Sequence, residues 1–208
     1  KILLDVLPHF EPHCYQIDSI CKVLDGIDLI AITPTGSGKT GHLFLTILVM
    51  IAITKTPSLC ATVKFSKDPT IVVVCPTNSI EQKMDENMTK LGVAALTLNS
   101  ETIATAQLRG EDIWAHTQAG ISMLILGPEQ LVSKSFRDLL AHEPFYAWVC
   151  ALGVDKIYLL VIWGLLFRKA FQQIGFMRAC LHPGIPLIGL TAMLKCGEGS
   201  VHWPNFSV

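Results

Sequence analysis

The sequence has few charged residues and no long apolar stretch. Only 16% of its 208 residues are charged, against about 25% in an average soluble domain. The longest nearly unbroken apolar runs cover residues 43–53 and 157–167, and both are far shorter than the roughly 20 residues of a membrane-spanning helix. We therefore interpret both runs as buried core elements and expect no contact with a membrane. Because half of the residues are apolar, disorder is excluded as well.

The chain also has almost no net charge and no closely spaced cysteine pair. Its 16 basic and 17 acidic residues leave a formal net charge of −1, so no overall field attracts polyanions. None of the seven cysteines forms a Cys-x-x-Cys motif, and no partner completes a metal set with His9 and His13. We predict no zinc site and a reducing, intracellular compartment. Any contact with nucleic acid must then come from local groups.

Short apolar runs alternate with longer amphipathic segments along the whole chain. The runs that predict strands cover residues 28–34, 71–75, 93–98, 121–126, 149–155 and 186–191. The segments that predict helices cover residues 38–53, 78–91, 102–117, 128–141 and 167–181. Repeated alternation of strand and helix is typical of a mostly parallel sheet with helices on both faces. We therefore predict one α/β domain that fills residues 1–208.

A glycine-rich segment follows the first predicted strand and opens a helix. It consists of Thr35, Gly36, Ser37, Gly38, Lys39 and Thr40. In that context glycines let backbone amides surround phosphates, and the helix N-terminus adds positive potential. A lysine in the position of Lys39 reaches the β- and γ-phosphates, and a hydroxyl in that of Thr40 binds Mg²⁺. Thr33 replaces the first glycine of the strict pattern, but strand, loop and helix together favour nucleotide binding over a chance turn.

Several further motifs follow this loop in a fixed order, and together they resemble those of superfamily 2 helicases. Residues 32–40 (ITPTGSGKT) are similar to motif I, and Tyr15 with Gln16 to the adenine-reading glutamine motif. The other resemblances are Pro76 and Thr77 to motif Ia; Gly127 and Pro128 to the RecQ form of motif Ib; Trp163, Phe167 and Arg168 to the RecQ aromatic-rich loop; and Thr191 to motif III.

This resemblance implies the first RecA-like lobe of a RecQ-like, ATP-dependent 3′–5′ DNA helicase. Gln16 and residues 35–40 would bind ATP, and Thr40 and Asp155 would hold Mg²⁺. The residues of motifs Ia and Ib and of the aromatic-rich loop would contact DNA, single-stranded or at a fork, and Thr191 would couple the two sites. Taken one at a time, Gln16 could be a surface residue, and Pro76 with Thr77 could be a strand-ending turn. Gly127 with Pro128 could be a helix start, and Trp163 and Phe167 could be core aromatics. The family also suggests a nuclear location.

The sequence departs from this family at motif II, which should read Asp-Glu-x-His. Here it reads Asp155, Lys156, Ile157 and Tyr158. In the family the glutamate orients the attacking water, and a charged lysine cannot accept its proton. After Thr191 only a short segment remains, so we expect no second lobe in this chain and no arginine finger. Both departures predict impaired hydrolysis and unwinding. The net charge of −1 predicts weak binding of DNA, because few groups neutralise phosphates.

Two other functions remain open. A non-catalytic pseudo-helicase would bind DNA or a protein without using ATP, and nucleotide binding by the isolated chain distinguishes it from an ATP-binding lobe. A small-molecule kinase would need an arginine-rich lid, and the chain has only four arginines, which are scattered. The ordered set of motifs favours the helicase lobe.

Overall fold

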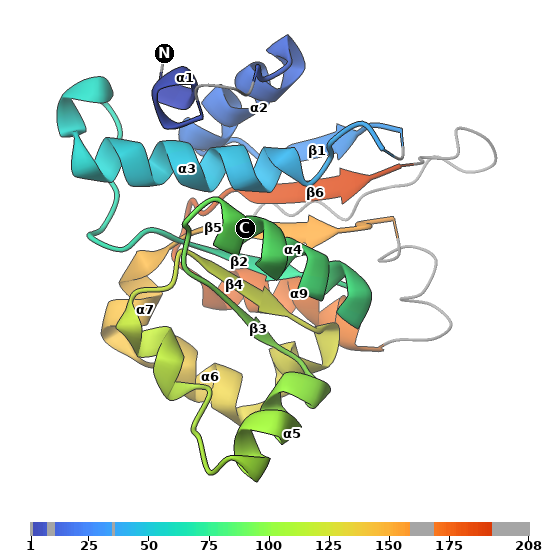
Figure 1. Ribbon diagram of the computed structural model, residues 1–208. Helices are drawn as coiled ribbons and strands as arrows, with labels where there is room; N and C mark the ends of the chain where they lie inside the picture. Colours follow the sequence, from blue (N-terminus) through green and yellow to red (C-terminus); the bar gives the residue numbers. More distant parts are fainter. Residues whose placement is uncertain (1, 8–10, 35, 159–168, 193–208) are drawn as a thin grey trace.

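The computed structural model describes residues 2–7, 11–34, 36–158 and 169–192. Its centre is a six-stranded sheet in the order β1-β6-β5-β2-β4-β3, with every neighbouring pair parallel (Figure 1). The strands are β1 (Leu29–Ile32), β2 (Thr70–Val74), β3 (Ala95–Leu98), β4 (Met123–Leu126), β5 (Val149–Asp155) and β6 (Leu187–Thr191). The prediction of an α/β fold with a mostly parallel sheet is confirmed.

The central strands are apolar throughout because helices cover both faces of the sheet. In β2, Val72 and Val74 pack into one core, whereas Ile71 and Val73 pack into the other. This alternation is the period of two that an extended chain imposes. β2 is therefore buried along its whole length, which explains its continuous run of β-branched residues.

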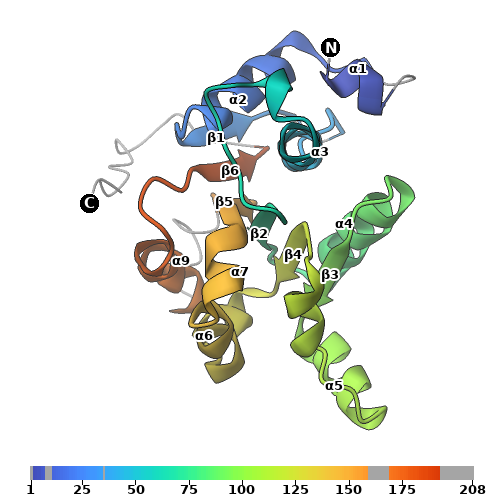
Figure 2. The ribbon, with the colours of Figure 1, turned by 90° about the vertical axis from the view of Figure 1, so that its left-hand side faces the viewer.

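One face of the sheet is covered by α3 (Gly41–Lys55) and α4 (Asn78–Lys90) (Figure 2). α1 (Ile2–Val6) and α2 (Cys14–Leu24) pack against the far side of α3. α3 therefore lies between two apolar layers and is apolar all round. This arrangement accounts for the apolar run at residues 43–53, which is a core helix as predicted. In the described part of the chain, no helix is both long and apolar enough to cross a membrane.

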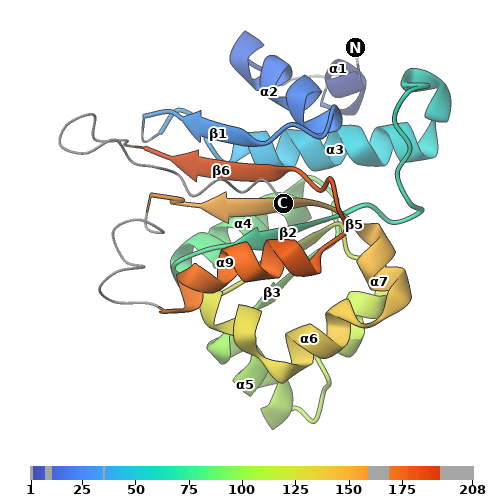
Figure 3. The same ribbon diagram turned by 180° about the vertical axis from the view of Figure 1, so that it is seen from behind.

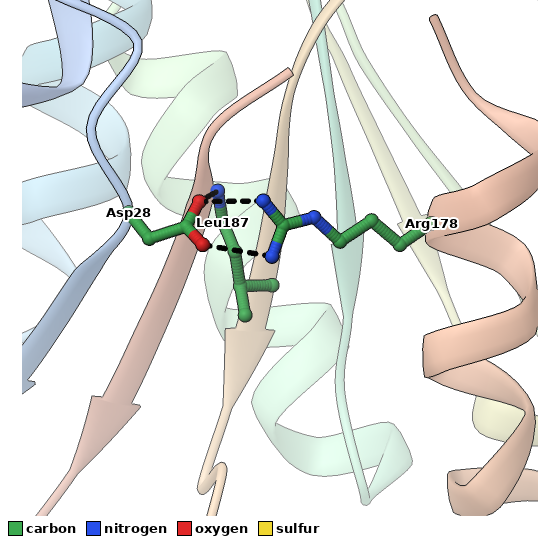
Figure 4. A network of polar contacts seen from close by, with 3 residues as sticks. All are labelled: Asp28, Arg178 and Leu187. Atoms are coloured by element: carbon green, nitrogen blue, oxygen red, sulfur yellow. Dashed lines mark hydrogen bonds and ion pairs between the residues drawn. The ribbon is translucent and has the colours of Figure 1, made fainter. Parts of the chain in front are cut away.

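The other face is covered by α6 (Lys134–Leu140), α7 (Glu143–Trp148) and α9 (Lys169–Cys180) (Figure 3). α9 is tied to the sheet by Arg178, whose guanidinium donates two hydrogen bonds of 2.8 Å to the Asp28 carboxylate (Figure 4). The same carboxylate accepts the Leu187 N–H at 2.9 Å. Asp28 thus joins the starts of β1 and β6 to a helix on the second face.

Two predicted helices are interrupted. The segment 102–117 forms α5 (Ser100–Leu108) and then a separate 3₁₀ turn, η2 (Ala115–Ala119), because Gly110 adopts a left-handed backbone with φ 69°. The segment 128–141 forms η3 (Pro128–Val132) and α6, because Ser133 is extended and its hydroxyl caps α6 through the Phe136 N–H. The short helices α1, α2 and α7, and the 3₁₀ turn η1 (Pro57–Leu59), were not predicted.

All six strands point the same way, so their carboxyl ends share one edge of the sheet. In open α/β sheets this edge is where ligands bind. It carries the glycine-rich loop after β1, Thr191 at the end of β6 and Asp155 at the end of β5. Pro76 follows β2, and Gly127 follows β4. Parallel strand direction alone therefore brings together motifs that are far apart in the sequence.

Candidate nucleotide-binding site

The glycine-rich loop turns tightly between β1 and α3. Gly36 and Gly38 have φ angles of 88° and 75°, a region that glycine enters without steric cost. The Ser37 hydroxyl donates to the Pro34 carbonyl at 2.7 Å. The loop leads into α3 through a turn in which the Gly41 N–H donates to the Gly38 carbonyl at 2.8 Å. Thr35 lies outside the described residues.

Lys39 reaches back across this loop. Its ammonium group donates to the carbonyl oxygens of Thr33 and Pro34, each at 2.9 Å. Both acceptors are neutral, so the ammonium charge has no anionic partner in these contacts. A phosphate oxygen is a stronger acceptor for such a donor, and the lysine is therefore placed to exchange carbonyl oxygens for phosphate oxygens.

Two side chains of helix α2 donate hydrogen bonds to the glycine-rich loop. The Tyr15 hydroxyl donates to the Ser37 carbonyl at 3.1 Å, and the Gln16 amide donates to the Gly38 carbonyl at 3.5 Å. The Gln16 side-chain oxygen accepts the His13 N–H at 3.0 Å, which fixes the orientation of the amide. Gln16 is 2% exposed, so the interpretation as an ordinary surface glutamine is wrong.

A cavity of about 660 Å³ joins these elements, within the range of about 300–1,000 Å³ typical of ligand pockets. Gln16 and the loop residues Gly36, Ser37, Gly38 and Thr40 line it together. Phe44 and Leu45 of α3 and Leu91 after α4 add apolar surface. A single cavity therefore offers an apolar wall, a fixed amide and a glycine-rich loop, the features that suit a base at one end and phosphates at the other.

Asp155 ends β5 one strand away from β1. It is 8% exposed, and burial raises the pKa of its carboxyl group, while a hydrogen bond from the Lys156 N–H and the charges of Lys156 and Lys39 lower the pKa. The Asp155 carboxylate thus lies within electrostatic reach of two ammonium groups. The oxygens of Asp155 and Thr40 are of the kind that Mg²⁺ takes alongside nucleotide phosphates, so this donor pair fits the ion.

Thr191 lies at the end of β6, between β1 and β5. It is buried, and its carbonyl oxygen accepts the N–H of Thr33 at 3.1 Å. The preceding carbonyl, that of Leu190, accepts the Ile157 N–H at 2.9 Å. The end of β6 is therefore bonded both to the start of the glycine-rich loop and to the residue after Lys156.

The predicted nucleic-acid residues Pro76, Thr77, Gly127 and Pro128 lie on the same edge, beyond Asp155. Acidic groups are their neighbours. The Glu129 carboxylate folds over Gly127, where a Cβ atom would overlap it. The buried Glu81 accepts a 2.5 Å hydrogen bond from the Asn99 amide. Burial raises the pKa of Glu81, the bond from Asn99 lowers it, and the nearby charge of Glu129 raises it further.

Trp163, Phe167 and Arg168 lie outside the described residues, so the structure does not place them. Tyr158 is described and half-buried, two residues after Lys156.

The sequence reasoning missed Gly41 and His42 at the start of α3. An ideal Cβ at Gly41 would lie 2.9 Å from the Gln16 amide nitrogen. The His42 ring packs 5.8 Å from that of Tyr15, centroid to centroid. A third glycine, directly after Gly36, Gly38 and the rest of the loop, was the available signal.

Fold and loop together define a RecA-like domain with a phosphate-binding loop. The sequence matches the DEAD/DEAH box helicase family over residues 14–146. This match covers more than half of the chain, which therefore belongs to the DEAD/DEAH box helicase family. The resemblance to the first lobe of RecQ-like superfamily 2 helicases is also confirmed, because named RecQ helicases match most of the chain.

Two curated relatives illustrate this match. ATP-dependent DNA helicase RecQ of Haemophilus influenzae is 25% identical over 85% of this chain and 25% of its own length. ATP-dependent DNA helicase Q1 of Rattus norvegicus is 25% identical over 92% of this chain and 28% of its own length. The chain thus spans about a quarter of each relative.

A solved structure shows the same fold. It is the DUF1998 helicase MrfA bound to DNA and AMPPNP, with a TM-score of 0.65 and 16% identity, over 94% of this chain and 26% of that one. At this level of identity the comparison supports the fold alone.

Proposed function

We propose that this chain is the ATP-binding lobe of a RecQ-like 3′–5′ DNA helicase, and that it binds ATP with impaired hydrolysis. One observation carries the proposal: Gln16 and the glycine-rich loop line the same cavity and are hydrogen-bonded to each other. The amide would contact the base, and backbone amides and Lys39 the phosphates. Thr40 and Asp155 would hold Mg²⁺, which would neutralise phosphate charge when bound.

Impaired hydrolysis follows from Lys156. The residue after Asp155 would orient the attacking water, and a lysine cannot take up its proton while charged. Lys156 also supports the second candidate, a pseudo-helicase that binds DNA or a protein without using ATP. Both candidates share the fold, but only the first requires a working phosphate-binding loop.

Binding of the isolated chain to ATP separates the two. Lys39→Ala removes a charge-assisted contact worth about 1.5–3 kcal/mol, so calorimetry should show at least about a tenfold weaker affinity. Thermal melting of the variant checks that it folds. Equal affinity of wild type and variant, or no binding by the folded wild type, would favour the pseudo-helicase.

DNA binding by this lobe should be weak. Pro76, Thr77, Gly127 and Pro128 would offer backbone groups, Trp163 and Phe167 stacking surfaces and Arg168 a phosphate contact, but Glu81 and Glu129 lie beside the first set. Few phosphates are neutralised, so the slope of log K against log salt should be shallow. Fluorescence anisotropy of labelled single-stranded DNA at several salt concentrations measures this slope. Tight binding that persists in high salt would contradict the proposal. Thr191 would couple the state of the bound nucleotide to the DNA-binding face. A DNA substrate would also imply an intracellular, nuclear location.

A further inference from the structure

Lys156 occupies an unusual backbone position. Its φ of 53° makes it the one non-glycine residue with a left-handed backbone in the part of the chain that the structure describes. The residues before and after Lys156 in the chain both contact β6. Asp155 pairs with Leu190 of β6, and the Ile157 side chain fills the space over Gly189. Lys156 is therefore held at a defined place on the carboxyl edge of the sheet and is half-buried there.

This place is close to the phosphate-binding loop. Only β6 separates β5 from β1, so the ends of these two strands are about 10 Å apart. Lys39 lies at the β1 end of this gap, where its ammonium group donates to the Thr33 carbonyl. Both lysine charges act on the Asp155 carboxylate, and that of Lys156 also acts on Cys75 at the end of β2. Asp155, Lys39 and Lys156 thus belong to the same edge of the sheet, and the charges of both lysines lower the pKa of the Asp155 carboxyl group.

The charge count of this cluster differs from that of a site with two carboxylates and one lysine. Such a site carries one net negative charge and reaches one net positive charge only after it binds Mg²⁺. Asp155, Lys39 and Lys156 carry one net positive charge by themselves. The positive charge that a divalent cation would bring to a bound triphosphate is therefore already supplied by the side chain of Lys156.

We propose that Lys156 takes over the charge-neutralising role of Mg²⁺, so that a nucleoside triphosphate binds this site with little dependence on divalent cations. This inference rests on the proposed nucleotide-binding function. Lys156 is a binding residue in this role, and no bond is made or broken. The oxygens of Thr40 and Asp155 can still take Mg²⁺, but the ion adds little affinity because a second ammonium group already belongs to this edge of the sheet.

The test compares ATP binding in Mg²⁺ and in excess EDTA by calorimetry, with the 208-residue chain. The wild-type dissociation constants should agree within about threefold. Lys156→Glu should restore a dependence on Mg²⁺, with affinity at least about tenfold weaker in EDTA than in Mg²⁺, since it replaces a charge-assisted contact by repulsion. Lys156→Arg keeps the charge and should behave like the wild type.

Lys156→Gly is the matched control for folding. Glycine adopts the left-handed backbone without strain, so this variant should melt no lower than the wild type and yet bind ATP more weakly in EDTA. The proposal is overturned if wild-type affinity falls tenfold or more in EDTA, or if Lys156→Gly and Lys156→Glu bind as well as the wild type there. Absence of binding by the folded wild type in both buffers overturns the nucleotide-binding function itself, an outcome distinct from binding that needs Mg²⁺.

Discussion

The amide nitrogen of Gln16 lies directly over Gly41, at a place where any other residue would put its Cβ 2.9 Å away. Gly41 is the first residue of α3, and Gln16 belongs to α2. The contact allows the glutamine to reach the Gly38 carbonyl and remain buried beside the phosphate-binding loop. A missing side chain on one helix therefore positions a functional side chain on another.

Substitution of Gly41 by alanine should impair recognition of the base without loss of stability. The Gln16 amide is the end of a flexible side chain and can move away, and alanine favours the helix by about 0.5–1 kcal/mol. We expect unchanged or higher thermal stability, weaker ATP binding and reduced preference for ATP over GTP, measured by calorimetry. Gln16→Ala should show the same loss of preference. Full discrimination between ATP and GTP in Gly41→Ala would contradict this role.

The pair formed by Asp28 and Arg178 should stabilise the fold more than an ordinary surface ion pair does. Asp28→Ala leaves the partly buried N–H of Leu187 without its acceptor, at a cost of about 1–3 kcal/mol. Arg178→Lys keeps the charge but loses the two-pronged geometry, and should cost less. Urea unfolding measures both. The control is Asp18→Ala, which breaks an exposed pair with Lys22 worth about 0–1 kcal/mol; an equal effect of all three would refute the assignment.

His42 should make the protein less stable in mild acid. It is 2% exposed, and neither ring nitrogen has a hydrogen-bond partner in the described structure; burial lowers its pKa. The unfolded chain binds the proton at a pKa of about 6.5, before the folded chain does. Stability is therefore full above that pH and is lost as the pH falls toward the lower folded-state pKa.

The substitution His42→Leu isolates this contribution. It removes an unpaired buried polar group and should raise stability by about 1–3 kcal/mol at neutral pH, with a larger gain between pH 6.5 and the folded-state pKa. Thermal melting of both proteins from pH 8 to pH 5 measures the difference. Parallel pH profiles for the two proteins would show that His42 does not titrate on unfolding.

ATP hydrolysis by the 208-residue chain should be very slow and should recover little with a repaired motif. Lys156→Glu with Tyr158→His restores the water-orienting carboxylate. The described residues form one lobe, however, and an arginine finger accelerates related reactions about 10³–10⁵-fold. We expect the double variant to show a small rise in phosphate release and no stimulation by DNA. Lys39→Ala is the negative control. Robust DNA-stimulated release by the wild type would show that Lys156 is no defect.

The sequence by itself determined the class of fold and the place of the loop. Continuous apolar runs such as residues 71–75 predict strands covered on both faces, and Gly36 and Gly38 after such a run predict a phosphate-binding turn. Parallel direction then places Asp155 and Thr191 on the same edge. These inferences need only local patterns and the rule that parallel strands share their carboxyl edge.

Only the tertiary structure decided how the site is supported. The contacts of Gln16 with Gly41 and of Arg178 with Asp28 join residues 25 or more positions apart, and their strength depends on distances of a few tenths of an ångström. The left-handed backbone of Lys156 and the unpaired ring of His42 also have no local signal. Both features follow from the packing around these two residues. Burial and the nearest available partner determine the conformation and the charge state, whereas local sequence propensity does not.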